Sequence, residues 1–333
     1  MSRSYQALLR RRTIIGSAAA ALTTLAVSPL QAQSKWPEKP VRFIVPFPPG
    51  GSVDPLARLI GVHLTESLGQ QIVVDNRPGA SGSIGTAAAA KSAADGYTFV
   101  FVFDTHAVNP SLISPLPFDT MKDLDPIMLI GTSPNLVATH PTRPYQSFRD
   151  VVAAAKAKPD TISIGTIGNG SLAHLTITLL QQQGDFRIVH VPYKGGGPLT
   201  QDLVAGHVDI GIATPAVLGA QAKAGKVRPL VVTGEKRTPV LPEVPSLAEQ
   251  GFPGFSALAF WGVLAPTGVP KPILEKFHAE VTKVLSNPDI RRQLSEQLGM
   301  ELVVSSPETF RSFLAAEIDR WGKVVRDNNI KAE

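Results

Sequence analysis

The sequence predicts an α/β protein of two lobes, each a doubly wound sheet flanked by helices. Three observations predict this fold. Short apolar runs alternate with helical stretches along the chain, which is typical of parallel sheets. A strand, a glycine turn and a helix occur together twice, at residues 43–60 and 161–180. The chain has 333 residues, 43% of them hydrophobic, which is enough for two such lobes.

The order of the predicted elements supports two series and sets their boundaries. In the first series, we expect strands at 41–45, 71–75 and 98–103, and helices at 55–68 and 86–92. Strands at 127–130 and 135–139 follow with little helix between them. In the second series, we expect strands at 161–164, 187–191, 210–213 and 231–232, and helices at 147–156, 172–180, 198–205 and 216–224. A strand at 259–264 and helices at 270–285 and 307–328 complete the chain.

The chain passes between the two series twice, near 131–139 and near 255–262. The first lobe is therefore predicted to be discontinuous. The predicted boundaries are 1–32 for a leader, 33–131 plus 261–333 for lobe 1, and 132–260 for lobe 2. Ligands of such sheets bind at the carboxyl ends of the strands, so two facing lobes predict a cleft between them.

The first turn, residues 46–51 (PFPPGG), follows a short apolar strand. Its prolines stop the sheet ladder, and Gly50 and Gly51 permit positive φ and close approach of another group. Ser52 or Gly51 is expected to cap the next helix. Free N–H groups at a helix start can receive a carboxylate, although an ordinary βα turn has the same pattern.

The second turn, residues 165–171 (GTIGNGS), repeats this arrangement. Thr166, Asn169 and Ser171 add neutral hydroxyl and amide groups, and several such donors can together hold a carboxylate. The alternative is that Ser171 or Asn169 caps its own helix. Both roles are compatible.

Further candidates lie near these turns. Phe47 is expected to cover an apolar part of a ligand or to pack between lobes. Tyr193 follows a strand end, where its ring could line a pocket and its hydroxyl could bind a solute. Thr214 follows another strand and is placed at the mouth. His174 and His106 could face the ligand or simply pack.

Two charged residues near the turns have alternative interpretations. Lys194 could steer an anion or be a solvated surface charge. Asp54 lies in the first turn of a helix, where interaction with the helix dipole is favoured. It could instead face the ligand, where it would bind an amine or restrict acids.

Residues 1–32 predict an export signal. Arg3 and residues 10–12 supply positive charge, residues 14–27 form an apolar run, and Ala32 precedes a cleavage point. The pair at 11–12 also approaches the twin-arginine pattern, so Sec and twin-arginine export remain open. A membrane anchor is the alternative, but the run is short for a span. We therefore expect a periplasmic protein.

Charge and composition exclude several functions. The formal net charge is +5, and residues 1–32 hold four arginines and no acid, so five minus four leaves +1 for the rest. A nucleic-acid partner is therefore not expected. The chain has no cysteine, which excludes disulfides and cysteine catalysis. Its seven histidines form no closely spaced metal-binding pair. We expect no metal and no cofactor.

One motif resembles a dinucleotide-binding fingerprint. Residues 168–173 (GNGSLA) follow a predicted strand and fit G-x-G-x-x-A. That fingerprint needs an acidic residue at the end of the next strand, to bind the ribose. Here Pro192, Tyr193 and Lys194 follow that strand instead. NAD binding is therefore disfavoured.

Six motifs together resemble one family. They are PFPPGGSVD at 46–54, NRPGASG at 76–82, ADGYT at 94–98, VPYKGGG at 191–197, EVPSLAEQG at 243–251 and WGVLAP at 261–266. In this order they resemble the Bug family, the substrate-binding proteins of tripartite tricarboxylate transporters. The resemblance covers roughly residues 36–328. It implies a two-lobed fold like that of type II periplasmic binding proteins.

The resemblance implies a protein, not an enzyme, that captures a small carboxylate-bearing solute in the cleft between lobes. It places the ligand against the two turns, partly through water. Asp104 and Ile167 stand where the family pattern favours smaller residues. The implied ligand-binding residues, with those proposed above, are Phe47, Pro48, Gly50, Gly51, Thr105, Thr166, Gly168, Asn169, Gly170, Ser171, His174, Tyr193 and Thr214.

Partners and alternatives follow from the same resemblance. We expect a monomer that binds a small organic acid and hands it to membrane permease subunits, or that presents it to a sensor ectodomain. One alternative is a secreted hydrolase or isomerase on the same scaffold. Another is a ligand-sensing partner of a two-component sensor. The sequence does not identify the solute, although neutral turn residues favour a ligand of low charge.

Overall fold

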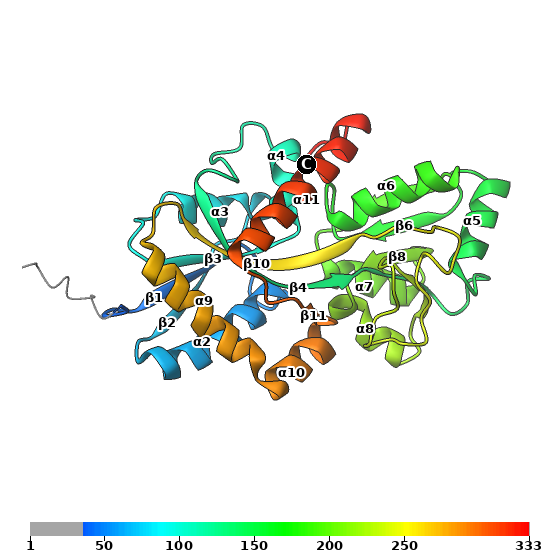
Figure 1. Cartoon of the computed structure of the whole chain (residues 1–333). Coiled ribbons are helices and arrows are strands. Elements are labelled where there is room, and N and C mark those ends of the chain that lie inside the picture. The colour runs from blue at the N-terminus through cyan, green and yellow to red at the C-terminus, as the bar shows by residue number, and fades with distance from the viewer. Residues whose placement is uncertain (1–35, 333) are drawn as a thin grey trace, which may run out of the picture. The chain divides into compact units, whose positions relative to one another are not determined.

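The computed structural model describes residues 36–332, so the predicted export signal at 1–32 lies outside the described residues. Residues from Lys39 onward form one compact unit. This unit contains two mixed sheets, of six and five strands, with helices around them (Figure 1). No helix of the described residues is long and apolar enough to cross a membrane.

The first sheet has the order β11-β4-β10-β3-β1-β2. Its strands are β1 (Val41–Val45), β2 (Ile72–Asn76), β3 (Thr98–Phe103), β4 (Leu124–Pro134), β10 (Leu258–Pro266) and β11 (Glu301–Leu302). β1 runs parallel to β2 and β3, whereas β10 is antiparallel to β3 and β4. The carboxyl ends of β1, β2 and β3 therefore meet at one edge, and the first turn leaves β1 there.

Helices cover both faces of this sheet. They are α2 (Val53–Leu68), η1 (Ala80–Gly82), α3 (Ser83–Ala90), α4 (Thr105–Leu112), α9 (Lys271–Ser286), α10 (Pro288–Leu298) and α11 (Pro307–Asp327). Neighbouring residues of a strand point to opposite faces. Phe43 of β1 accordingly contacts the ring of Phe277 in α9, while Ile44 packs in the cluster that contains Phe310 of α11. Both faces are thus buried, as expected for a sheet whose parallel strands are joined by helices.

The second sheet has the order β7-β6-β8-β5-β9. Its strands are β5 (Leu136–Thr139), β6 (Ser163–Thr166), β7 (Val189–Pro192), β8 (Ile210–Ala213) and β9 (Arg228–Val232). β6 is parallel to β7 and β8, and β5 is antiparallel to β8 and β9. The second turn leaves the carboxyl end of β6, so the two turns occupy equivalent places in the two sheets.

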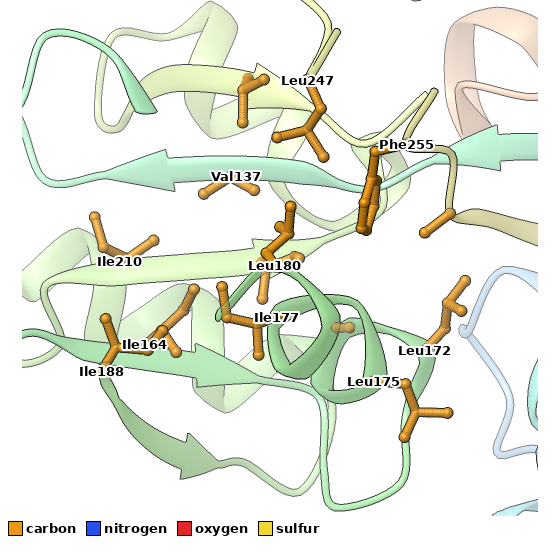
Figure 2. Packing of buried hydrophobic residues seen from close by; sticks show 14 of the residues in the cluster. Val137, Ile164, Leu172, Leu175, Ile177, Leu180, Ile188, Ile210, Leu247 and Phe255 are labelled. Carbon is orange, nitrogen blue, oxygen red and sulfur yellow. The ribbon is translucent and has the colours of Figure 1, made fainter. Parts of the chain in front are cut away.

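Apolar clusters hold helices on both faces of the second sheet. The helices are α5 (Phe148–Ala157), α6 (Leu172–Gly184), α7 (Gly196–Ala205) and α8 (Pro215–Lys223). Ile177 and Leu180 of α6 point toward Ile164 and Ile210 of the strands (Figure 2). A second cluster joins residues of α7 and α8 to the opposite face of the sheet.

The two segments that pass between the sheets are tied together by one threonine. Thr233, which is fully buried, accepts a hydrogen bond from the Asn135 N–H at 2.9 Å through its Oγ1 and donates one to the Ala257 carbonyl at 2.6 Å. Its backbone bonds the same two residues. Asn135 lies between β4 and β5, and Ala257 precedes β10. Figure 1 shows β4 and β10 side by side where they leave the first sheet.

The predicted alternation of strands and helices is confirmed, and most boundaries agree within a few residues. Two α-helices and the short 3₁₀ helix η1 were not predicted. α4 contains Pro110 near its carboxyl end, and a proline inside a helix removes one backbone hydrogen bond. α10 begins with Asn287 as its cap and Pro288 in its first turn, a pattern that resembles a loop.

Candidate functional site

A closed network around Asp54 shapes the first turn. Asp54 is only 6% exposed. Its carboxylate accepts hydrogen bonds from the Gly50 N–H at 3.2 Å, from Arg58 Nε at 3.0 Å and from Asn76 Nδ2 at 3.0 Å. Asn76 also donates to the Phe47 carbonyl at 3.1 Å. The carboxylate therefore ties the turn to α2 and β2.

The ionised form of Asp54 is favoured. Burial alone would raise the pKa of Asp54, but the hydrogen bonds from Arg58, Asn76 and Gly50 hold that pKa below its ordinary value. Asp54 lies in the first turn of α2, as predicted. Its carboxylate also accepts a hydrogen bond from the Gly50 N–H, one of the groups predicted to bind a ligand. Its charge is satisfied by donors from the first turn, α2 and β2.

The predicted cap of α2 is wrong in one respect. Ser52 stands at the capping position, but its side chain makes no capping bond. Its Oγ instead accepts a hydrogen bond from Trp261 Nε1 of β10 at 3.1 Å. This bond fixes the start of α2 to the middle of the sheet. No local pattern predicts this bond, because Ser52 and Trp261 are far apart in the chain.

The remaining predicted residues of the first turn lie at its surface. Pro48, Gly50 and Gly51 are exposed, and Phe47 is half-buried. Phe47 contacts the ring of Phe103 at the end of β3, with centroids 6.2 Å apart. A Cβ added at Gly82 would lie 3.2 Å from the Phe47 ring. The first turn therefore packs against the loop that precedes α3.

Helix α4 connects this loop to the second turn. Thr105 Oγ1 and Asn109 Nδ2 both donate to the Ser81 carbonyl, at 3.0 and 3.1 Å. At the other end of α4, a Cβ added at Gly170 would lie 2.2 Å from Leu112. From Thr105 to Leu112 the helix rises about 10 Å. Helix α4 therefore contacts η1 through Thr105 and the second turn through Leu112.

The second turn satisfies many of its own hydrogen bonds. The Gly168 N–H donates to Thr166 Oγ1 at 3.3 Å, and the Gly170 N–H donates to His174 Nδ1 at 3.1 Å. Ser171 Oγ donates to the Gly168 carbonyl at 2.7 Å and accepts from the His174 N–H at 3.3 Å. Ser171 is therefore a helix cap, one of its two predicted roles. Asn169, at the tip of the turn, is half-buried.

Two histidines stack behind the second turn. The rings of His174 in α6 and His190 in β7 are 3.9 Å apart at their centroids and 13° from parallel. His190 Nε2 lies 2.7 Å from Thr166 Oγ1. Burial, with the neighbouring His190 as a second cause, lowers the pKa of His174 to about 4, and burial lowers that of His190 to about 4. Both rings are therefore neutral near pH 7.

Tyr193 and Thr214 flank the second turn. The Tyr193 N–H bonds the Thr166 carbonyl at 3.0 Å, and its hydroxyl donates to Asp202 at 2.9 Å. Because this hydroxyl already bonds Asp202, the ring is the part of Tyr193 that could line a ligand pocket. Thr214 starts α8 at the carboxyl end of β8. The register pairs Gly165 with Gly211, which places Thr214 at the same sheet edge as the second turn.

Asp104 and His106, whose roles the sequence left open, are buried at 5% and 2% exposure. Burial raises the pKa of Asp104 well above its usual range, with nearby Glu317 adding to the effect. Burial lowers the pKa of His106 to about 4, and its ring stacks on Phe118 at 6.1 Å. His106 therefore packs in the core, the second of its predicted alternatives.

Sequence reasoning missed three contributors to the site. Asn76 and Arg58 complete the Asp54 network, and His190 completes the stacked pair. The spacing of Asp54 and Arg58 is a four-residue helical pair, which could have been found. A histidine inside an apolar strand was the available signal for His190. Among residues 36–332, no cluster of three or more histidines and acids could hold a metal ion.

The fold is that of a two-lobed periplasmic binding protein. Residues 56–330 match the model of the tripartite tricarboxylate transporter family receptor. The chain therefore belongs to that family, as the motifs predicted. Members of the family are periplasmic binding proteins, and the solved structures similar to this chain include such proteins.

Three similar proteins illustrate the family. Protein BugT of Bordetella pertussis is 38% identical over 307 residues, which cover 91% of this chain and 93% of BugT. A solved R. palustris protein with adipate is 35% identical, with a TM-score of 0.82, covering 90% of this chain and 100% of that protein. MatC from Rhodopseudomonas palustris, with bound malate, is 31% identical, with a TM-score of 0.76, covering 87% of this chain and 100% of MatC.

Proposed function

We propose that this chain is exported to the periplasm and captures a small dicarboxylate between its first and second turns, for delivery to membrane permease subunits. One observation carries this proposal. Both turns follow parallel strands at the carboxyl edge of their sheets, and α4 contacts the neighbourhood of each through Ser81 and Gly170. The second turn has backbone and hydroxyl donors for one end of such a ligand, and the first turn presents exposed glycine backbone to the other end.

The ligand class is supported by two relatives and by the spacing of the turns. The similar R. palustris structures hold adipate and malate, each of which has two carboxylates. The length of α4, about 10 Å, is comparable to a small diacid hydrogen-bonded at both ends. The ligand-binding residues in this proposal are Phe47, Pro48, Gly50, Gly51, Thr105, Thr166, Gly168, Asn169, Gly170, Ser171, His174, Tyr193 and Thr214.

The same proposal includes closure of two lobes, 33–131 plus 261–333 and 132–260, around the ligand. The crossing segments held by Thr233 are suited to act as the hinge, since a hinge needs few residues that absorb the motion. We propose binding without turnover and a monomeric protein. Incubating the purified protein with candidate diacids, and following their consumption, tests for an enzyme.

A thermal-shift screen across carboxylic acids tests the function directly. A ligand at 100 times its dissociation constant adds about 2.7 kcal/mol to stability. We expect small dicarboxylates, adipate and malate among them, to raise the melting temperature more than monocarboxylates of equal length. A screen in which no carboxylate stabilises the protein would contradict the proposal.

Gly51→Val tests the first turn. A Cβ at Gly51 would meet only the Pro48 carbonyl oxygen, at 3.6 Å, so the fold should accept the change. The branched side chain should block the approach of a carboxylate, and we expect at least a tenfold loss of affinity by calorimetry, about 1.4 kcal/mol. Gly197→Val is the control, because a Cβ there has no neighbour within 4 Å. Unchanged affinity in Gly51→Val would exclude the first turn as the site.

A further inference from the structure

The stacked histidines hold two of the donors that the second turn would offer to an anion. The Gly170 N–H donates to His174 Nδ1, so the proton of that neutral ring is on Nε2. Thr166 has a single hydroxyl hydrogen, with His190 Nε2 at 2.7 Å and the Gly168 carbonyl at 3.3 Å. We assign His190 the tautomer with its proton on Nδ1, in which Nε2 accepts that hydrogen. As neutral rings, the pair therefore competes with a ligand for both donors.

Protonation reverses this competition. A proton from solvent on His190 Nε2 turns that nitrogen into a donor to Thr166 Oγ1, and the Thr166 hydrogen is released toward a carboxylate. A proton on His174 Nδ1 likewise releases the Gly170 N–H. The ring centroids are 3.9 Å apart, so two adjacent positive charges would repel each other. The pair can therefore accept one proton readily, but not two.

Other charges near the pair are already engaged or exposed. Tyr193 donates to Asp202, which also contacts His207, and Lys194 is exposed at the end of β7. Asp209, beyond the other end of β6, accepts from Ser163 and pairs with Arg143. Within the described residues, only the partner ring adds a charge effect to the burial of His174, and burial alone acts on His190. An incoming carboxylate would be the first anion to favour the protonated pair.

We propose that His174 and His190 act as one positioning unit that makes capture of a carboxylate at the second turn proton-linked, with one proton taken up by the pair as the ligand binds. This inference rests on the proposed function, because it needs an acid at the second turn. No covalent bond other than one N–H bond is formed, and the proton comes from solvent. His174 and His190 thereby set which donors of the turn are available to the ligand.

The expected effect is a change of affinity with pH. An opposite charge nearby raises the pKa of a histidine by about 1–3 units. The pKa of the histidine pair is then higher in the complex than in the free protein. Protonation therefore does not change the ligand affinity at a pH above the pKa of the complex, and the affinity increases as the pH falls through that value. For a rise of about two units, adipate should bind about tenfold more tightly at about pH 5 than at about pH 7, after correction for its own ionisation.

Calorimetric titration with adipate at about pH 5.5, in two buffers of different ionisation enthalpy, counts the protons exchanged. The test compares the wild-type protein with the double variant His174→Asn and His190→Gln, whose amides keep the hydrogen bonds but cannot titrate. His63→Gln, on the surface of α2, is the matched control. We expect an uptake of about half to one proton in the wild type and in the control, relative to the double variant.

Equal proton uptake in the wild type and the double variant would overturn the proton linkage while leaving adipate binding intact. Absence of binding by every carboxylate would instead overturn the proposed function. If the double variant does not fold, the ring resonances of His174 and His190 in the wild type give the same information by nuclear magnetic resonance. A pKa that rises when adipate binds supports the inference, and an unchanged pKa contradicts it.

Discussion

The first and second turns have the same backbone plan, but opposite chemistry holds them in place. The first turn is organised by an ionised carboxylate, Asp54, which accepts from Gly50, Arg58 and Asn76. The second is organised by two neutral imidazoles, which accept from Gly170 and contact Thr166. A glycine turn alone therefore does not define an anion site. The group behind the turn decides which donors remain for a ligand.

This difference gives the turns different responses to acid. Asp54 has a pKa lowered from its ordinary 3.8, so its contribution to stability is present above that value and is lost as pH falls through the folded pKa. His174 and His190 have folded pKa values of about 4 against an ordinary 6.5. The unfolded histidines bind protons first, so stability falls as pH drops from 6.5 toward 4. The second turn should therefore respond to acid before the first.

The largest effect is expected from Gly170→Ala in the second turn. Gly170 has φ +67°, and an added Cβ would lie 2.2 Å from Leu112. Backbone strain and overpacking each cost about 1–3 kcal/mol. We expect a fall of that size in the free energy of unfolding and a loss of diacid binding, measured by denaturant titration and calorimetry.

Gly168→Ala and Leu112→Ala separate the two causes of that effect. Gly168 has φ +136°, but its Cβ would meet only the Tyr193 carbonyl, at 3.4 Å, so Gly168→Ala has strain without the clash. Adding Leu112→Ala to Gly170→Ala should restore part of the lost stability, since the clash is removed. Stability of Gly170→Ala equal to that of the wild type would show that α4 does not contact the second turn.

The pH response of the second turn is the next largest effect. We expect the melting temperature of the wild-type protein to fall between about pH 6.5 and about pH 4, and the decline to be smaller in the double variant His174→Asn and His190→Gln. Neutral amides have no proton to gain in this range. Parallel pH profiles of the two proteins would show that the stacked pair does not set the acid response.

In the first turn, Asp54→Asn should reduce stability at neutral pH by about 1–3 kcal/mol, because Gly50, Arg58 and Asn76 lose a charged acceptor. Asp289→Asn is the matched control. Asp289 also lies in the first turn of a helix and pairs with an arginine, but its side chain is 76% exposed. Its loss should stay below about 1 kcal/mol.

The difference between Asp54→Asn and the wild type should vanish in acid, below the folded pKa of Asp54. Denaturant titrations at several pH values measure this. A difference that is independent of pH would mean that Asp54 acts by shape alone, and the contrast between a charged first turn and a neutral second turn would be lost.

The fold was predictable because its signals are local. The alternating elements and both glycine turns could be predicted from short stretches, and the six motifs identified the family. What holds the turns could be predicted only in part, because the partners are distant in sequence. Ser52 bonds Trp261 instead of capping α2, and His174 meets a ring on the next strand, His190. The Asp54–Arg58 pair, four residues apart on a helix, and the Ser171 cap had local signals.

The smallest effect is expected from Ser171→Ala, which tests whether the Ser171 hydroxyl caps its own helix or binds the ligand. Ser171 is 5% exposed, and its hydroxyl hydrogen goes to the Gly168 carbonyl. Loss of a cap costs about 1 kcal/mol of stability. Because that hydrogen is not directed at the ligand, we expect the affinity for adipate to fall less than about threefold, under 1 kcal/mol.

Ser147→Ala is the control for this change, because Ser147 caps α5 through a capping box with Asp150. Both variants should lose similar stability in denaturant titrations, and only Ser171→Ala should affect binding at all. A tenfold loss of affinity with unchanged stability in Ser171→Ala would mean that the hydroxyl turns to the ligand when it binds. The second turn would then donate hydrogen bonds to an anion, as the first turn does to Asp54. His174 and His190 would support the turn without determining which donors reach the ligand.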